Sequence, residues 1–358
     1  MSKPRFRLVD VAQRAGVSVA TVSRVLSQHP HVKEDTRRRV KSALVELRYD
    51  PQALYTDFVP HGEAPMVGFL VPSSMAMLGL NRAVYLTLVQ TIREAVEARG
   101  YGLYVGTFSG THNGDLVGDR VIRERQIEGA IVSRIRSEDE IQPLRDAGLV
   151  IVALNRPMAA AGVHAVTVDN RRAAADAARH LIDLGHRRIG VLAGPADVFS
   201  AAERLEGYEQ AVRAAGLPTD TLVVARTDLA EEQGLLATAD LLDQSHRPTA
   251  ILAVNDYLAL AAIDLARTRG LHVPRDLSVV GFDDIESARY VRPALTTVHM
   301  PWDGMAVWAA RLLADALADP RTEKAVVQMS TEFMVRDSTA APSGAARRKK
   351  QESLMHVV

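Results

Sequence analysis

Hydrophobic positions recur with two different periods along this chain, and the change of period separates a short N-terminal segment from a long remainder. From Leu8 to Leu26 the small and apolar residues follow a helical period in two short runs. The positions that would bring these two helices together are Leu8, Val11, Ala12 and Ala15 in the first run and Val22, Val25 and Leu26 in the second.

The residues between the two runs favour a sharp turn. Gly16 tolerates a positive φ, and Ser18 is a suitable N-cap for the second helix. Two short helices joined in this way form either an ordinary helical hairpin in a core or a helix-turn-helix whose second helix enters the DNA major groove. Because small, glycine and apolar residues all match the motif, we expect the helix-turn-helix.

A third helix is predicted from Glu34 to Leu47, with Val40 and Leu44 on its buried side. Thr36 and the basic run 37–39 lie near its start. A basic run is often only a solvated face, but here it can approach the DNA backbone, so we assign Thr36 to the DNA-binding surface.

After the Pro- and Gly-containing stretch 59–65, short apolar runs alternate with helical patterns. This alternation predicts parallel sheets covered by helices, and two consecutive sets of it, the second starting at Val166, predict two doubly wound lobes with a crevice between them. The strands are expected at 66–71, 101–107, 130–132, 150–154, 188–193, 222–225, 250–253 and 277–282, with the stretch VTVDN starting at 166, and the helices at 83–99, 117–125, 173–184, 204–215, 234–242 and 257–269.

Composition narrows the class of protein. A length of 358 residues predicts two or three domains, and the absence of cysteine excludes disulfides and thiolate metal sites. The N-terminus has no apolar run typical of a secretory signal, and no stretch approaches 18 apolar residues, so we expect a cytoplasmic protein without a membrane span. Residues 1–58 carry 11 Lys and Arg against 6 Asp and Glu, while the rest of the chain carries a net −5, which is typical of a small basic nucleic-acid module on a larger domain.

Two long stretches resemble the lactose/galactose-repressor (LacI/GalR) family of bacterial transcription regulators. VDVAQRAGVSVATVSRVL and HVKEDTRRRVKSALVELRYDP are similar to its DNA-binding headpiece over residues 8–51. LIDLGHRRIGVLAGP, ERLEGY, PTAILAVND, RGLHVPRDLSVVGFDD and PALTTV are similar to its two-lobed domain, which is shared with periplasmic sugar-binding proteins. The resemblance implies that residues 297–325 return to the first lobe.

The second helix carries the candidate DNA contacts. Val19, Ala20 and Arg24 are expected to reach base edges, as the resemblance also implies, the first two against thymine methyl groups and the arginine on guanine. The hydroxyls expected on phosphates are those of Ser18, Thr21 and Ser23. The alternative for Arg24 is a solvated surface arginine.

The hinge after Pro51 departs from the family pattern. The resemblance implies a hinge helix with a leucine wedge in the minor groove, but this chain has Tyr55 in place of a small residue and Phe58 in place of the leucine, beside Asp57. Phe58 is a candidate wedge because aromatic side chains can be inserted between base steps, and its alternative is a simple packing role.

Polar residues at strand ends are the candidate effector contacts. Asn255 and Asp283 follow apolar strands, and the resemblance implies ligand contacts for them and for Asn155, with Arg156 beside it, and Arg204. The alternatives are structural hydrogen bonds for each, and helix capping by one member of the pair Asp283–Asp284. Where the family often has a stacking aromatic this chain has Leu229, so the ring would come from Tyr85, Trp302 or Trp308.

The sequence therefore predicts an all-α helix-turn-helix headpiece (1–51), a hinge and linker (52–65), an α/β two-lobed domain of two doubly wound parallel sheets (66–338) and a disordered basic tail (339–358). Its function would be that of a dimeric repressor on a palindromic operator, controlled by a sugar or sugar derivative, with no cofactor, metal or membrane.

Three alternatives stay open. The first is a regulator with a non-sugar effector or with none. The second is a free sugar-binding protein, which would share the lobes but not the headpiece. The third is an enzyme, which is disfavoured because GxxxxGK[ST], GxGxxG after the first strand, HExxH and GxSxG motifs are absent.

Overall fold

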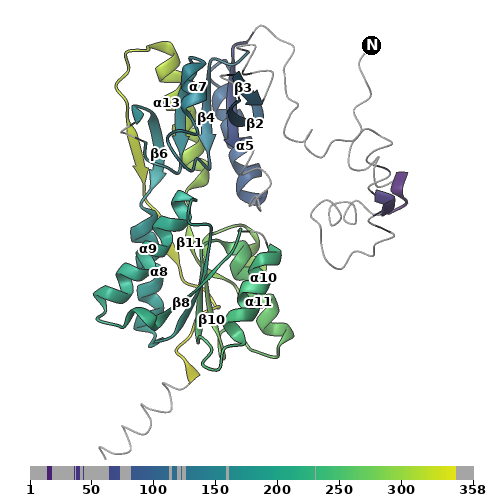
Figure 1. The fold of residues 1–358 in the computed structure, drawn as a ribbon, viewed down its shortest axis with the longest axis vertical. Coiled ribbons are helices and arrows are strands. Elements are labelled where there is room, and N and C mark those ends of the chain that lie inside the picture. The colour runs from purple at the N-terminus through teal and green to yellow at the C-terminus, as the bar shows by residue number, and fades with distance from the viewer. Residues whose placement is uncertain are drawn as a thin grey trace, which may run out of the picture. The chain divides into compact units, whose positions relative to one another are not determined.

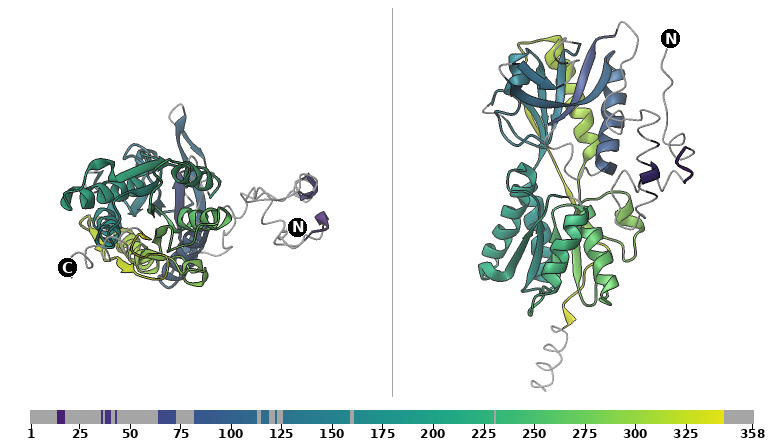
Figure 2. Two further views of the ribbon diagram at one scale, coloured as in Figure 1. Left: turned by 90° about the horizontal axis from the view of Figure 1, so that it is seen from below. Right: turned by 45° about the vertical axis from the view of Figure 1, so that its right-hand side comes forward.

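The computed structural model describes residues 14–17, 36, 38–40, 43, 64–72, 82–112, 115–118, 122, 126–158, 161–229 and 231–343. The chain divides into two compact units, Met1–Val59 and Pro60–Val358. Most of the second unit is described, and it contains two sheets (Figures 1 and 2).

In the first unit the described residues agree with the predicted helices and turn. Arg14 and Ala15 are helical, and Gly16 has φ +65°, the left-handed conformation expected of the turn. Helix also covers Thr36, residues 38–40 and Ala43, and Val40 is fully buried as predicted. The predicted contacts Ser18, Val19, Ala20, Thr21, Ser23, Arg24 and Phe58 lie outside the described residues.

The first lobe is built on a seven-stranded sheet of order β12-β6-β5-β4-β1-β2-β3. The helices α5 and α13 lie side by side on it (Figures 1 and 2). The bounds are Met66–Pro72 (β1), Arg82–Glu97 (α5), Gly102–His112 (β2), Asp115–Gly118 (β3), Gly129–Ser133 (β4), Gln142–Asp146 (α7), Val150–Leu154 (β5), His164–Val168 (β6), Trp302–Ala318 (α13) and Val326–Met329 (β12).

The second lobe is built on a six-stranded sheet of order β13-β11-β10-β9-β7-β8, with α8 and α9 on one side and α10 and α11 on the other (Figure 1). The bounds are Asn170–Asp183 (α8), Ile189–Ala193 (β7), Phe199–Ala214 (α9), Thr219–Thr221 (η3), Leu222–Arg226 (β8), Glu231–Leu242 (α10), Ala250–Ala253 (β9), Asp256–Thr268 (α11), Ser278–Asp283 (β10), Ser287–Tyr290 (α12), Thr296–His299 (β11) and Glu332–Met334 (β13).

The two helices α8 and α9 pack closely because of one glycine. A Cβ atom on Gly207 would lie 2.2 Å from the carbonyl oxygen of Arg171 and 2.8 Å from Cβ of Ala174. Only a residue without a side chain allows this approach. The same contact holds α9, and with it Arg204, firmly against the second lobe.

The chain crosses between the lobes three times: from β6 to α8, from β11 to α13 and from β12 to β13. The last two crossings enclose the segment that was predicted to return to the first lobe. After β11, helix α13 and strand β12 belong to the first lobe, and β12 pairs with β6 in parallel. The predicted return of 297–325 is therefore confirmed for α13, although β11 itself (296–299) remains in the second sheet.

Three details of the predicted layout are wrong. Strand β6, expected to open the second lobe, pairs with β5 in the first sheet, because a short apolar strand carries no mark of the sheet it joins. Both sheets are mostly parallel, but β3 and β13 are antiparallel edge strands. Residues 115–118, partly assigned to a helix, form β3, which pairs with β2 across the dipeptide Asn113-Gly114, a hairpin signal in the sequence.

The C-terminal segment of the second lobe extends beyond the boundary predicted at residue 338. The backbone N–H of Ala340 donates to Ser278 Oγ at 3.0 Å, and Thr339 Oγ1 lies 3.0 Å from His180 Nε2. These contacts hold both residues on the lobe, so the lobe extends at least to Ala340. Among the described residues, no helix is both long and apolar enough to span a membrane.

Candidate functional site

One cavity of about 920 Å³, counted with the open solvent at its mouth, has walls from both lobes. All six residues predicted to contact an effector line it: Tyr85, Asn155, Arg156, Arg204, Asn255 and Asp283. They come from the ends of β5, β9 and β10 and from the helices α5 and α9. The carboxyl ends of parallel strands meet at one edge of each sheet, and this geometry brings residues distant in the sequence together.

Arg204 is the most buried cation of the cavity, with 5% of its surface exposed. Its Nε donates to Asn170 Oδ1 at 3.0 Å, and its Nη1 donates to the carbonyl oxygen of Val254. Nη1 also lies 3.6 Å from Asp283 Oδ1. Burial lowers the pKa of Arg204, and the negative charge of Asp283 opposes this shift.

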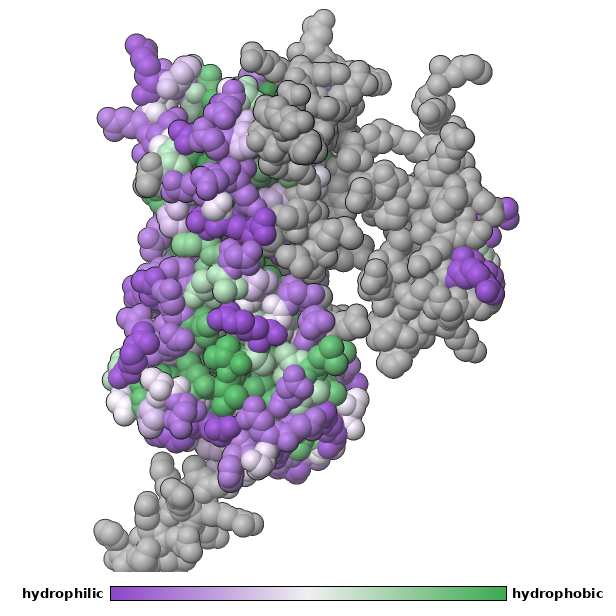
Figure 3. Space-filling view, viewed as in Figure 1, coloured by the Kyte–Doolittle hydropathy of each residue, from purple (hydrophilic) through white to green (hydrophobic). Residues whose placement is uncertain are grey.

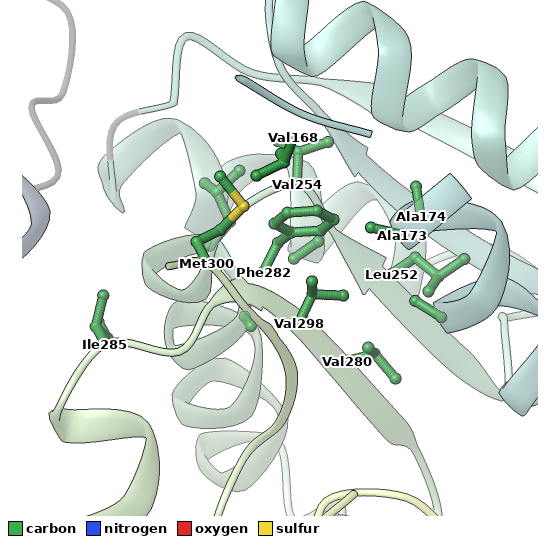
Figure 4. Close-up of a cluster of buried hydrophobic side chains, with 14 of the residues drawn as sticks. Val168, Ala173, Ala174, Leu252, Val254, Val280, Phe282, Ile285, Val298 and Met300 are labelled. Carbon is green, nitrogen blue, oxygen red and sulfur yellow. The ribbon is translucent and has the colours of Figure 1, made fainter. Parts of the chain in front are cut away.

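The guanidinium of Arg204 also stacks on an aromatic ring. Its Cζ lies 3.6 Å from the ring centroid of Phe282, at the end of β10. Figure 4 shows this ring within a cluster of hydrophobic side chains that includes Val168, Val254 and Met300. A ring fixed by such packing in turn fixes the plane of the guanidinium.

A chain of hydrogen bonds joins the two lobes through Asn170, the first residue of α8. Asn170 Oδ1 accepts from Arg204, and its Nδ2 donates to Asn155 Oδ1 in the first lobe at 3.0 Å. Asn155 has φ +58°, a conformation that asparagine adopts more readily than most residues. Two further contacts between the lobes are the ion pair of Arg136 with Asp197 at 3.3 Å and Arg156 over the Phe199 ring at 4.9 Å.

Asn255 has two roles. It is the N-cap of α11, and its Oδ1 accepts from the backbone N–H of Leu258 at 2.8 Å. Asn255 also lines the cavity, and the cap uses only its Oδ1, so its NH₂ group is left to donate.

The predicted capping by Asp283 or Asp284 is wrong. The following helix α12 begins after Glu286, and no side chain caps it. Asp283 lines the cavity, whereas Asp284 is fully buried and binds Arg336 at 2.5 Å, Arg289 at 3.1 Å and His299 at 3.2 Å. The Asp284 carboxylate is thus taken up by side chains from α12, β11 and the C-terminal segment rather than by the start of a helix.

The aromatic residues of the cavity differ in part from those expected. Tyr85 and Trp302 line it, and so does Phe199, which the sequence reading missed. Trp308 lies outside the cavity, 37% exposed, with Arg311 Cζ 5.1 Å from its ring centroid. Leu229, in place of the family aromatic, lines the wall with φ +71°.

Arg134 was also missed. It lines the cavity directly after β4 and has φ +61°. Desolvation lowers the pKa of Arg134 to about 10, while the charge of Asp283 opposes this shift. The signal was present, because Arg134 follows a buried apolar strand just as Asn155 and Asn255 do.

The fold and cavity define a class of protein: a two-lobed α/β ligand-binding domain that follows a helix-turn-helix sequence. Residues 7–52 match the family model of bacterial regulatory proteins, lacI family, and residues 178–339 match that of a periplasmic binding protein-like domain. The chain is 31% identical over 335 residues to the HTH-type transcriptional repressor PurR of Klebsiella pneumoniae, covering 92% of this chain and 96% of that one.

Solved structures of transcriptional regulators are similar to this chain over most of its length. A complex of the transcriptional regulator CelR with cellobiose matches with TM-score 0.66 and 31% identity, covering 93% of this chain and 100% of that chain. The lac repressor dimer bound to operator and the anti-inducer ONPF matches with TM-score 0.64 and 25% identity, covering 95% and 100%. The chain belongs to the LacI family and is a DNA-binding transcriptional regulator controlled by an effector.

Proposed function

We propose that this regulator is a dimeric repressor that binds a palindromic operator and responds to a sugar or sugar derivative in the cavity between its lobes. The observation that carries the proposal is that one cavity collects all six predicted contact residues, from both lobes. An effector that touches both lobes can bias their relative placement, and it can shift DNA affinity only through its different affinity for the two states.

The composition of the cavity supports a sugar. Amide, carboxylate and guanidinium groups suit neighbouring hydroxyls, and Tyr85, Phe199 and Trp302 offer rings for the apolar face of a pyranose or furanose. Trp302 Nε1 is buried without a hydrogen-bond partner among the described residues, so an acceptor on a ligand would satisfy it. The solved CelR structure holds cellobiose.

Exposed hydrophobic residues support a dimer. Leu86 on α5 is 63% exposed, and Leu236 on α10 and Val224 on β8 are 56% and 42% exposed. Figure 3 shows a hydrophobic area on the second lobe around β8. Such surfaces are commonly covered in an assembly, and the lac repressor structure is a dimer on its operator.

We assign DNA recognition to the predicted headpiece, residues 1–51, and effector binding and dimerisation to the region from 66 onward. Base contacts are proposed for Val19, Ala20 and Arg24, and phosphate contacts for Ser18, Thr21, Ser23 and Thr36, with Phe58 as a minor-groove wedge. The protein would then act in the cytoplasm, at the nucleoid, and without catalysis.

The DNA-binding part is tested by selecting bound fragments from random or genomic DNA with the purified full-length protein. We expect a palindromic consensus whose affinity falls about 5- to 150-fold in Arg24→Ala, the equivalent of about 1–3 kcal/mol for one arginine on guanine. Arg213→Ala, on the exposed side of α9, is the control and should bind as the wild type does. Selection of the same palindrome with unchanged affinity by Arg24→Ala would contradict the proposed role of this residue.

The effector part is tested with a panel of mono- and disaccharides in a thermal-shift assay. A ligand of the native state raises the melting temperature. The ligand found in this way should then change operator affinity in a binding assay, and a panel without any stabilising member would contradict the sugar effector.

A further inference from the structure

Among the polar side chains that line the cavity, those that can only donate hydrogen bonds outnumber those that can only accept them. We propose that the effector is an anionic sugar derivative whose carboxylate or phosphate group binds Arg134. This inference rests on the proposed function, because it specifies the ligand of the same cavity.

Hydrogen bonds fix the orientation of the side-chain amides of Asn155 and Asn255, which both line the cavity. A guanidinium can only donate, so the Asn170 atom that faces Arg204 Nε is its oxygen, and its NH₂ group therefore points to Asn155. This makes Oδ1 the Asn155 atom that accepts from Asn170. Asn255 is fixed in the same way, because its Oδ1 accepts from the backbone N–H of Leu258. Both side chains thus have their oxygens engaged and present NH₂ groups to a ligand.

Two further groups of the cavity can only donate, whereas the hydroxyls of Ser133, Ser200 and Tyr85 can donate or accept. Arg156 Nε and Trp302 Nε1 are buried and have no hydrogen-bond partner among the described residues. A hydroxyl group both donates and accepts, whereas a carboxylate or phosphate oxygen only accepts. A ligand with such oxygens therefore fits a wall of donors better than a neutral sugar does.

Arg134 is the cation best placed for the anionic group. It lines the cavity at the end of β4, and within the described part of the chain it has neither a hydrogen bond nor an ion pair. Its φ of +61° is unfavourable for a long side chain, a strain that is often found at ligand sites. Desolvation lowers its pKa to about 10, so the side chain is still charged at neutral pH, and the charge of Asp283 acts on it without forming an ion pair with it.

The charged side chains that line the cavity carry more positive than negative charge. Among the described lining residues there are three arginines, Arg134, Arg156 and Arg204, and one carboxylate, Asp283, which lies 3.6 Å from Arg204. Glu138 and Glu140 act on Arg156 from outside the cavity, and Glu140 also binds Arg136 at 2.8 Å. An anionic ligand would supply the missing charge and form charge-assisted hydrogen bonds with Arg134.

Matched ligands test this inference on the full-length protein. We would measure binding of glucose, galactose and ribose, of their terminal phosphates, and of glucuronate, galacturonate and gluconate by calorimetry and thermal shift. We expect at least one anionic form to bind at least tenfold more tightly than its neutral parent. A preference for the phosphates or for the acids would identify the anionic group.

Variants of Arg134 tie the preference to this residue. Arg134→Gln should remove the advantage of the anionic form, and Arg134→Lys should keep part of it, because lysine retains the charge but not the planar fork. Arg145→Gln, at an exposed position of helix α7 in the same lobe, is the control and should bind as the wild type does.

The possible failures are distinguishable. If a neutral sugar binds as tightly as its anionic forms, or if Arg134→Gln keeps the preference, the anionic effector is wrong and the sugar effector stands. If no sugar of either kind binds, the proposed effector and this inference both fall. Binding of the anionic form that depends on Arg134 would support both.

Discussion

The two walls of the cavity differ in how far their polar groups are already satisfied. In the second lobe, Arg204 is bonded to Asn170 and to the carbonyl of Val254, and Asn255 caps α11. In the first lobe, Arg156 Nε has no partner among the described residues, and Arg134 has neither a hydrogen bond nor an ion pair there. The second lobe offers a fixed surface, and the first offers groups that a ligand must satisfy.

This difference indicates that the stability of the fold depends mainly on the second-lobe wall, whereas the choice of ligand depends mainly on the first-lobe wall. Side chains that are locked by the fold lose little freedom when a ligand binds, so they fix its orientation. Groups that lack a partner discriminate between ligands, because only a matching ligand compensates their burial. Substitutions in the second-lobe wall should therefore affect folding and binding together, and those in the first-lobe wall should affect mainly binding.

The largest effect is expected for Arg204→Met. The change removes the donor to Asn170 Oδ1 and the cation 3.6 Å from Asp283 Oδ1 in a buried site, so we expect the free energy of unfolding to fall by about 3–5 kcal/mol. Urea unfolding followed by circular dichroism measures it. The control Arg213→Met, on an exposed ion pair of the same helix, should cost less than about 1 kcal/mol, and equal losses would contradict the assigned difference.

A smaller effect separates the two roles of Asn255. Asn255→Ala removes the N-cap of α11 and should lower the free energy of unfolding by about 0.5–2 kcal/mol. Asn255→Asp keeps a capping oxygen, so its stability should stay close to that of the wild type. It loses the NH₂ donor and adds a negative charge, and calorimetry should show weaker binding of an anionic effector. Unchanged binding would exclude Asn255 from the effector site.

Trp302→Phe tests the first-lobe wall. Nε1 has no partner among the described residues, so its loss breaks no hydrogen bond there, and stability should change by about 1 kcal/mol or less. Effector affinity should fall about threefold to tenfold, as expected for one neutral hydrogen bond to the ligand. Trp308→Phe, on the same helix but outside the cavity, should leave affinity unchanged, and an equal loss in both variants would argue against the contact.

The smallest effect is expected for the dependence of stability on pH, to which buried histidines of both lobes contribute. Burial lowers the pKa of His164 in the first lobe and of His180 and His186 in the second. These histidines bind protons more readily in the unfolded chain, where their pKa has the ordinary value of 6.5. The stability that they contribute is therefore fully present above that pH and is lost as the pH decreases below it. Unfolding midpoints measured between pH 7 and pH 5 should show this decline.

Substitution of His186 tests how much of this decline in stability comes from the second lobe. His186 contacts Thr249, Ser278 and the carbonyl of Ala340, and His186→Gln should flatten the dependence on pH. His246→Gln, at an exposed position, should leave it as in the wild type. Identical pH profiles in all three proteins would show that His186 does not contribute.

Most of the architecture was predictable from the sequence because it depends on local periodicity. The alternation of apolar strands and helices predicted the two lobes, and the rule that polar residues at strand ends face the crevice predicted Asn255 and Asp283. The same rule, applied to the end of β4, would have found Arg134. Phe199 was missed because the helix α9 was expected to begin only at Arg204, whereas it begins at Phe199.

What the sequence by itself determined is the class of protein, its two lobes and six residues of one cavity, since these follow from short-range patterns and from resemblance. Only the tertiary structure decided that β6 belongs to the first sheet, that Asp284 binds Arg336, Arg289 and His299 instead of capping a helix, and that the side-chain oxygens of Asn155 and Asn255 already accept hydrogen bonds. Hydrogen bonds and ion pairs form between residues distant in the chain, so which polar groups remain for a ligand is determined only once every nearer partner is in place.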